Sequence, residues 1–424
     1  MTKLPKRERR IIDLEDIGVP ENLSLTEPNI LYPPGHAVFL AIFFKLTGQA
    51  RYVYPETIVL LLDAVVAPLL LYFLGKRLFS RGVGLVAASL YSVWLSFAFL
   101  ATQARSEQLL SSVSLGLLVS LYMFLTQWRW RWLAVMAILI AVGVNLRPDM
   151  LATVPLAAAA VAIAKRKRWI QSIAYAALVG CLLTLVAVAS LIPYAGLYWE
   201  AFGRLGFATP ALAVNVWEGI GEYPNRWGAT SNDDDVRALL QPYGLRIWTP
   251  EAEKQLWSKI RPVASEDPVW LAGTFARRAV RILFMKYDWG APSFRNKLDI
   301  PGAKVSAHCA SWKVLPGGSA TCWLVALGYI AMVRGTPFLD WSLWIGAIVG
   351  VIIFRKRPYV WLLLVLPLAR LIPFSFIHVE PRYILYGMGP SLVFLAALLV
   401  TGWQSRTRVL AAAQSVWPQR KPAV

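Results

Sequence analysis

The residues Leu133 to Ala164 read LAVMAILIAVGVNLRPDMLATVPLAAAAVAIA, and this stretch decides the fold class. Its charged residues are Arg147 and Asp149, which stand on either side of Pro148. A helix needs roughly 20 apolar residues to cross the hydrocarbon core of a bilayer, and shorter runs must recruit their flanks. We therefore expect two membrane helices joined by a polar turn at Arg147-Pro148-Asp149.

Comparable apolar runs fill most of the 424-residue chain, which is 57% hydrophobic and 16% charged. A soluble protein of this size carries about 25% charged residues. Spanning runs are predicted at 56–74, 83–103, 109–126, 133–145, 150–164, 169–191, 338–354, 359–376 and 384–402, and a shorter run at 321–333 is interpreted as interfacial or re-entrant. The sequence predicts an all-α polytopic membrane protein, a helical bundle with an outer soluble insertion.

The basic residues, which give a formal net charge of +19, gather in short loops between apolar runs. This distribution follows the positive-inside rule and differs from the continuous basic stripe of a nucleic-acid-binding protein, so we expect no nucleic acid partner. With the basic loops in the cytoplasm, three pairs of arginine and carboxylate fall on the opposite side of the membrane: Arg105 with Glu107, Arg147 with Asp149, and Arg382 with Glu380.

The run lengths divide the chain into an N-terminal membrane module (1–191), an extracytoplasmic insertion (192–320) and a C-terminal membrane module with a cytoplasmic tail (321–424). Helices are predicted to begin at Thr249-Pro250 and at Asp267-Pro268. Arg277, Arg278 and Arg281 favour a basic amphipathic helix on the membrane surface for the second of these. Cys309 and Cys322 could form a disulfide or remain two separate thiols.

Two segments at the predicted outer rim carry acidic and basic side chains that could take part in catalysis or bind a phosphate. Glu107 opens a helix, where a carboxylate either complements the helix dipole or takes a proton from an acceptor hydroxyl, and we favour the second role. Arg147 is either a polar residue that the turn between two helices requires or a ligand of a phosphate group. Before the last helix, His378, Glu380, Arg382 and Tyr383 lie within six residues, and Arg382 is our leading phosphate ligand.

Two further segments are weaker candidates. Tyr32 and His36 flank a di-proline before an apolar helix, where a substrate contact is conceivable although prolines alone suit a helix start. Asp233-Asp234-Asp235 follows Asn232, and a solvated helix N-terminus explains it better than a metal site. We therefore predict no cofactor and no metal ligands, since a divalent metal has no support in the sequence.

Several of these motifs occur together in a fixed order: Tyr32-Pro33-Pro34-Gly35, Gly75-Lys76-Arg77-Leu78-Phe79, Ser106-Glu107, Leu146-Arg147-Pro148 and Arg382-Tyr383. In this order they resemble the GT-C membrane glycosyltransferases that use polyprenyl-phosphate sugars. The nearest groups are the bacterial relatives of protein mannosyltransferase and of lipid A aminoarabinose transferase. The resemblance covers most of 31–160 and 361–400.

The resemblance implies a GT-C-like bundle in the bacterial inner (plasma) membrane, with an active site on the extracytoplasmic side that serves the cell envelope. Its partners would be a polyprenyl-phosphate-linked sugar, the lipid bilayer and an unknown glycan, lipid or protein acceptor. Glu107 would be catalytic. The substrate-binding candidates are Arg382, Tyr383, Arg147, His378, Glu380, His36, Arg105 and Tyr32.

One departure concerns the segment before the di-proline. The family places a membrane helix there, followed by a loop with an essential aspartate, whereas this chain opens with a basic, polar segment. Either the start is truncated and the catalytic aspartate is missing, which we favour, or an upstream acid such as Asp16 substitutes for it. An inactive truncated homologue and a transporter or flippase of a lipid-linked sugar remain the alternatives. Charges at one rim and the lack of a sequence repeat favour the enzyme.

Overall fold

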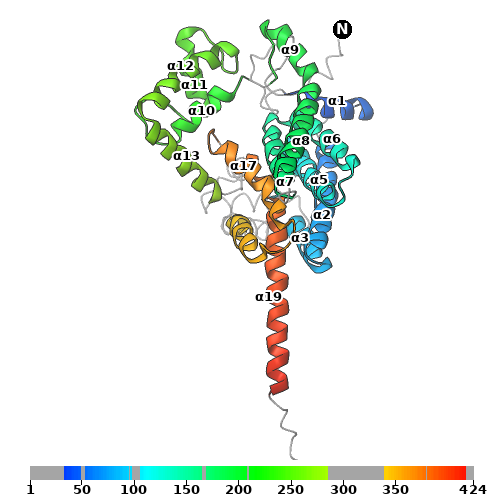
Figure 1. Ribbon diagram of the computed structural model, residues 1–424. Helices are drawn as coiled ribbons and strands as arrows, with labels where there is room; N and C mark the ends of the chain where they lie inside the picture. The colour runs from blue at the N-terminus through cyan, green and yellow to red at the C-terminus, as the bar shows by residue number, and fades with distance from the viewer. Residues whose placement is uncertain are drawn as a thin grey trace, which may run out of the picture.

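The computed structural model describes residues 33–48, 53–94, 96–97, 106–164, 169–207, 210–284, 339–378 and 380–416. Within these ranges all regular secondary structure is helical, which confirms the all-α prediction for this part of the chain (Figure 1).

The first half of the chain forms α1 (Gly35–Thr47), α2 (Val53–Leu78), α3 (Arg81–Val93), α5 (Ser106–Gln127), α6 (Trp130–Leu146), the 3-10 helix η1 (Pro148–Ala152), α7 (Thr153–Ala164), α8 (Trp169–Ser190) and α9 (Ile192–Phe202). The second half forms α10 (Leu212–Gly221), α11 (Asp233–Leu240), η2 (Gln241–Tyr243), α12 (Pro250–Glu266), α13 (Pro268–Leu283), a helix at Leu339–Phe354, η3 (Val360–Leu364), α17 (Val365–Phe374), α18 (Pro381–Leu385) and α19 (Gly389–Val416).

The long apolar helices share one core. Helix α2 packs on α3 and α5, α5 packs on α6, and α19 packs on α3. Leu71, Leu118, Ile140 and Val393 come from four different helices and are all fully or almost fully buried in this core. Figure 1 shows α19 leaving the bundle and continuing well beyond it, and its residues 401–407 are exposed.

Two glycines bring α2 and α3 into backbone contact. A Cβ atom at Gly84 would lie 2.5 Å from the carbonyl oxygen of Tyr72, and one at Gly75 would lie 2.7 Å from the Cα of Gly84. Both distances are too short for real atoms, so glycine is required on both helices. Close approach through small residues is a common way to pack helices in membranes, where apolar surface alone does not drive association.

In the part of the chain that the structure describes, two helices are long and apolar enough to cross a membrane, at Leu109–Gln127 within α5 and Ile170–Ser190 within α8. The apolar helices at Gly35–Thr47, Arg81–Val93, Trp130–Leu146, Pro148–Ala164, Leu339–Phe354 and Val360–Phe374 are shorter. Helix α8 packs on α6 and α7 and exposes aliphatic residues such as Ile170 and Leu185, as a lipid-facing helix would.

The predicted span 83–103 is not one continuous helix, because α3 ends at Val93 and Trp94 is extended. Buried carboxylates stand on either side of this end. Tyr91 donates a hydrogen bond to the Asp63 carboxylate at 2.9 Å, whereas Ser96 and the Trp94 indole donate to Asp340 at 2.6 and 3.2 Å. A buried carboxylate needs such donors, and the side chains after α3 turn toward Asp340 to supply them.

The predicted spans near the C-terminus are also interrupted. Run 359–376 forms η3 and the ten-residue α17, and α19 begins at Gly389 instead of 384 because α18 precedes it. Prolines mark these boundaries: Pro373 lies one residue before the end of α17, Pro381 begins α18, and Pro390 follows the first residue of α19. Proline lacks an N–H donor, so it suits a helix start and weakens a helix interior.

Helices α10 to α13 pack around a second apolar core, which includes Val214, Trp217, Leu256 and Ile260. The predicted helix starts are confirmed here. Thr249 accepts a hydrogen bond from the Ala252 amide, Asp267 accepts one from the Trp270 amide, and Asn232 at the start of α11 accepts one from the Asp234 amide. Capping by Ser, Thr, Asp or Asn satisfies amides that a helix start leaves without partners.

Helix α13 corrects one interpretation. Its arginines were assigned to a membrane surface, but Arg278 is fully buried and contacts Glu222 and the carbonyl oxygens of Gly219 and Ser375. Arg278 therefore faces other protein segments, whereas Arg277 and Arg281 are exposed. The predictions for 321–333, Cys309, Cys322, Asp16, Tyr32 and Arg105 lie outside the described residues.

The glycine contact between α2 and α3 yields a first prediction. Gly84→Ala should lower the free energy of unfolding by about 1–3 kcal/mol, because the new methyl group meets rigid backbone. Thermal unfolding of the purified protein in detergent measures this change. Gly82→Ala is the matched control, since the nearest atom to its Cβ would lie 3.9 Å away. Equal unfolding temperatures for the two variants would contradict the packing account.

Candidate functional site

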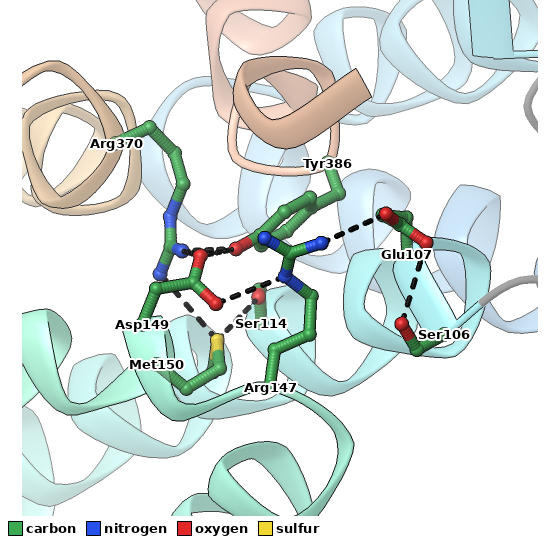
Figure 2. Close-up of polar contacts among 8 residues, drawn as sticks. All are labelled: Ser106, Glu107, Ser114, Arg147, Asp149, Met150, Arg370 and Tyr386. Atoms are coloured by element: carbon green, nitrogen blue, oxygen red, sulfur yellow. Dashed lines mark hydrogen bonds and ion pairs between the residues drawn. The ribbon is translucent and has the colours of Figure 1, made fainter. Parts of the chain in front are cut away.

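Polar side chains from three parts of the chain converge at one end of the bundle. Glu107 lies in the first turn of α5, Arg147 and Asp149 lie between α6 and α7, and Arg370 and Tyr386 come from α17 and the end of α18. Figure 2 shows these five side chains pointing toward one another. We call them the polar network.

Local sequence explains how the first two segments present their charges. Arg147 caps α6 in an extended conformation, and Pro148 then begins the 3-10 helix that carries Asp149. Proline disfavours a helical residue before it, so α6 ends and Arg147 turns aside. Arg147 reaches across to α5 and donates from Nη1 to Oε1 of Glu107 at 2.8 Å. Ser106 donates to the other carboxylate oxygen at 3.3 Å.

Asp149 joins the two guanidinium groups. Its Oδ1 accepts from Nε of Arg147 at 3.0 Å, and its Oδ2 accepts from Nη1 of Arg370 at 2.7 Å. The Tyr386 hydroxyl contacts both Asp149 and Arg370, so the network also holds the end of α18 (Figure 2). Met150 places its sulfur 3.5 Å from Arg370 and from Ser114.

The network is buried and electrically balanced. Glu107 exposes 4% of its surface and Arg370 none, while the side chains of Arg147 and Asp149 expose 15% and 16%. Two carboxylates face two guanidiniums, so the formal charges cancel. Isolated charges are very costly in a medium of low dielectric constant, and such mutual pairing is what makes their burial possible.

An aromatic side chain lies against Arg147. The centroid of the Tyr383 ring on α18 lies 4.0 Å from the Arg147 guanidinium carbon, and the ring also stacks on Phe374 with 5.5 Å between ring centroids. A cation over an aromatic face is attracted to it by about 0.5–2 kcal/mol. Tyr383 therefore connects the helix that carries Arg382 to the polar network.

Further carboxylates lie beside the network. Burial raises the pKa of Glu380 to about 7, and its electrostatic neighbours include His378, Glu107, Arg147 and Asp233. Burial also raises the pKa of Glu218 on α10, as does a side-chain hydrogen bond with Asp233. These groups bring α10 and α11 into the electrical surroundings of Glu107.

The structure brings together some of the residues predicted from sequence and separates others. Glu107, Arg147 and Tyr383 make direct contacts, and Glu380 is close enough to act on both charges. His378 instead contacts Glu222, and His36 stacks on Phe39 of its own helix at 6.5 Å. The backbone of Arg382 lies in the short helix α18, but its side chain is outside the described part.

Arg370 and Tyr386 are residues that sequence reasoning missed. Arg370 was absorbed into the predicted span 359–376, and Tyr386 into the span 384–402. A lone arginine inside an apolar run was the available signal, because a charge at membrane depth needs an acidic partner. Asp149 had been assigned to a turn with Arg147, and it is the partner that Arg370 uses.

Among the described residues, no group of three or more His, Cys, Asp or Glu side chains is arranged to hold a metal ion. In α11, Asp234 pairs with Arg237 on an exposed surface.

Residues 32–192 match the family model described as Dolichyl-phosphate-mannose-protein mannosyltransferase. A comparison with curated proteins finds no significant match. A comparison with solved structures finds none either. The family match confirms the predicted resemblance over the segment that carries Glu107, Arg147 and Asp149. Arg370, Arg382 and Tyr386 lie beyond the matched segment.

The balance of charges in the network yields a second prediction. Asp149→Asn should lower the free energy of unfolding by about 3–5 kcal/mol, because it leaves two buried guanidiniums facing one carboxylate. Asp234→Asn is the control, since it breaks an exposed ion pair of 2.6 Å whose loss costs about 1 kcal/mol or less. Thermal and denaturant unfolding in detergent compare the two variants. Similar losses for both would show that the network contributes no special stability.

Proposed function

We propose that this protein is an integral-membrane glycosyltransferase that moves a sugar from a polyprenyl-phosphate donor to an acceptor hydroxyl on the extracytoplasmic side. One observation carries the proposal: Glu107 begins α5 as a buried carboxylate held by Arg147, inside the segment that matches the mannosyltransferase family. A positioned carboxylate next to a cationic group is the pairing that sugar transfer from a phosphate ester needs.

The proposed reaction is a displacement at the anomeric carbon. The acceptor oxygen forms a bond to that carbon, and the bond from the carbon to the phosphate oxygen breaks with its electron pair. Glu107 orients the acceptor hydroxyl and takes its proton. Arg147 already holds one carboxylate oxygen of Glu107 at 2.8 Å, so the orientation of this group is set before a substrate arrives.

The departing polyprenyl phosphate gains negative charge, which guanidinium groups stabilise. We assign this role to Arg382, whose backbone lies in α18, and to Arg147. Tyr383 supports the assignment, since its ring lies 4.0 Å from the Arg147 guanidinium and it follows Arg382 in the chain. Tyr32, Arg105, His36, Glu380 and His378 remain proposed substrate contacts, and Asp16 a proposed second catalytic acid, on sequence grounds.

The distribution of charge at the two ends of α5 supports an orientation in which Glu107 is on the extracytoplasmic side. Lys76 and Arg77 end α2, and Arg357 lies against the same end with its guanidinium 5.3 Å from the Phe79 ring. The hydroxyl of Tyr359 reaches the carbonyl of Leu125, near the last residue of α5. The 22 residues of α5 span about 33 Å. Glu107 and these basic groups are at opposite ends of α5, and a cytoplasmic location of the basic end under the positive-inside rule supports an extracytoplasmic Glu107.

A transfer assay tests the proposal. Purified protein in lipid vesicles is incubated with a radiolabelled polyprenyl-phosphate sugar and an envelope extract as acceptor, and released polyprenyl phosphate is measured. Glu107→Gln should lower the rate by about 10²–10⁴-fold, the usual contribution of a general base. Arg382→Ala should remove the release of polyprenyl phosphate altogether.

Glu251→Gln serves as the control for both variants, because Glu251 forms only an exposed pair of 3.6 Å with Arg204. Full activity in Glu107→Gln would reject the catalytic assignment. Movement of the intact lipid-linked sugar across the vesicle membrane, without release of polyprenyl phosphate, would identify a flippase instead.

Glu380 yields a prediction about pH. With its pKa raised to about 7, Glu380 is largely protonated at pH 6 and largely charged at pH 8. A polyprenyl-phosphate sugar is a phosphodiester and keeps its negative charge over this range. Rising pH should therefore weaken donor binding through charge repulsion. Equilibrium binding of polyprenyl-phosphate sugar at pH 6, 7 and 8 checks the trend, and Glu380→Gln should flatten it.

A further inference from the structure

The α10–α13 unit, residues 210–284, contacts the segment that leads into α18. Helix α13 packs against α17, and the two lie next to each other in Figure 1. Phe275 on α13 meets Phe376 edge to face, with 5.0 Å between ring centroids. The His378 amide donates to the Asn215 carbonyl of α10 at 2.7 Å. Residues 375–378 are therefore held from the side opposite the bundle.

Glu222, directly after α10, is the centre of this contact. Its Oε1 lies 2.7 Å from Nδ1 of His378, and its Oε2 lies 3.1 Å from Arg278 and 3.0 Å from Arg281. The Glu222 side chain exposes only 3% of its surface. Burial alone would raise its pKa, but the hydrogen bond to His378 and the two guanidiniums outweigh burial and lower it.

Arg278 extends the same contact to the backbone. It is fully buried, donates to the Ser375 carbonyl at 3.0 Å and also contacts the Gly219 carbonyl. Gly219 is necessary for this approach. A Cβ atom there would lie 2.9 Å from both the Arg278 guanidinium and the His378 amide nitrogen. Charge and backbone shape thus fix the same segment independently.

The held segment continues directly into the proposed phosphate site. His378 precedes Arg382 by four residues, and Tyr383 follows with its ring against Arg147. Tyr386, directly after the last residue of α18, contacts Asp149. The start of α18 is thus anchored by the Glu222 contact before it and by the polar network after it.

We propose that Glu222 is a positioning residue for glycosyl transfer, which sets the place of α18 and its Arg382 through His378 and Arg278. The inference rests on the proposed function and adds the α10–α13 unit to the machinery of the site. A misplacement of about 1 Å at a reacting group costs up to about 100-fold in rate. Loss of the Glu222 charge should therefore reduce catalysis although Glu222 touches no substrate.

Glu222→Gln is the test variant. Its amide oxygen can still accept from His378, but the negative charge facing Arg278 and Arg281 is gone. The control is Glu266→Gln on α12, which alters an exposed pair of 3.5 Å with Arg226. Hydrogen–deuterium exchange of peptides covering 375–385 measures positioning directly. We expect exchange there to be at least about tenfold faster in Glu222→Gln and unchanged in Glu266→Gln.

The transfer assay then separates positioning from general stability. At a temperature where both variants remain folded, Glu222→Gln should lower kcat for release of polyprenyl phosphate by about 10–100-fold, with a smaller change in KM for the acceptor. Glu266→Gln should retain wild-type values. A mere loss of stability would leave kcat of the folded fraction unchanged.

Gly219→Ala provides a second route that leaves every charge in place, with Gly273→Ala as its control because no atom lies within 4 Å of a Cβ there. Unchanged exchange at 375–385 in both Glu222→Gln and Gly219→Ala would overturn the positioning role. If exchange at 375–385 is faster in the two variants but the wild-type protein itself transfers no sugar, the positioning contact is established and the proposed function is rejected.

Discussion

The pairing of two buried carboxylates with two guanidiniums is the constraint on which the rest of the site depends. Glu107, Arg147, Asp149 and Arg370 come from α5, the turn after α6, η1 and α17, and none could be buried without the others. Their contacts fix the end of the bundle at which α18 and the α10–α13 unit meet it. The helices supply the apolar surroundings that make these pairings strong and their absence costly.

Much of this end could be predicted from the sequence, because charges in apolar runs are rare and must find one another. The turn at Arg147-Pro148-Asp149 and the helix start at Glu107 were both found in this way, and the structure joins them at 2.8 Å. The pairing of Asp149 with Arg370 was not found, since 221 residues separate them. Local patterns reveal that a charge needs a partner, but only the fold selects it.

The errors in the predicted helices have a related cause. Apolar length alone made 83–103 one span, whereas the structure ends α3 at Val93, where Tyr91, Trp94 and Ser96 reach the buried carboxylates of Asp63 and Asp340. Arg278 was assigned to a membrane surface because a basic helix face is typical of one, yet it lies buried against Glu222. In each case the side chain is oriented by a carboxylate that is distant in the sequence.

The glycine contact between α2 and α3 limits how a long lipid could reach this site. At Gly75 and Gly84 the two helices meet backbone to backbone, with no side chains between them. They cannot move apart there without losing this packing. This contact closes the seam between α2 and α3 at the end of α2 that carries Lys76 and Arg77. If the proposed polyprenyl-phosphate donor binds at the polar network, its isoprenoid tail would have to leave the bundle between helices that are packed through side chains instead of through backbone.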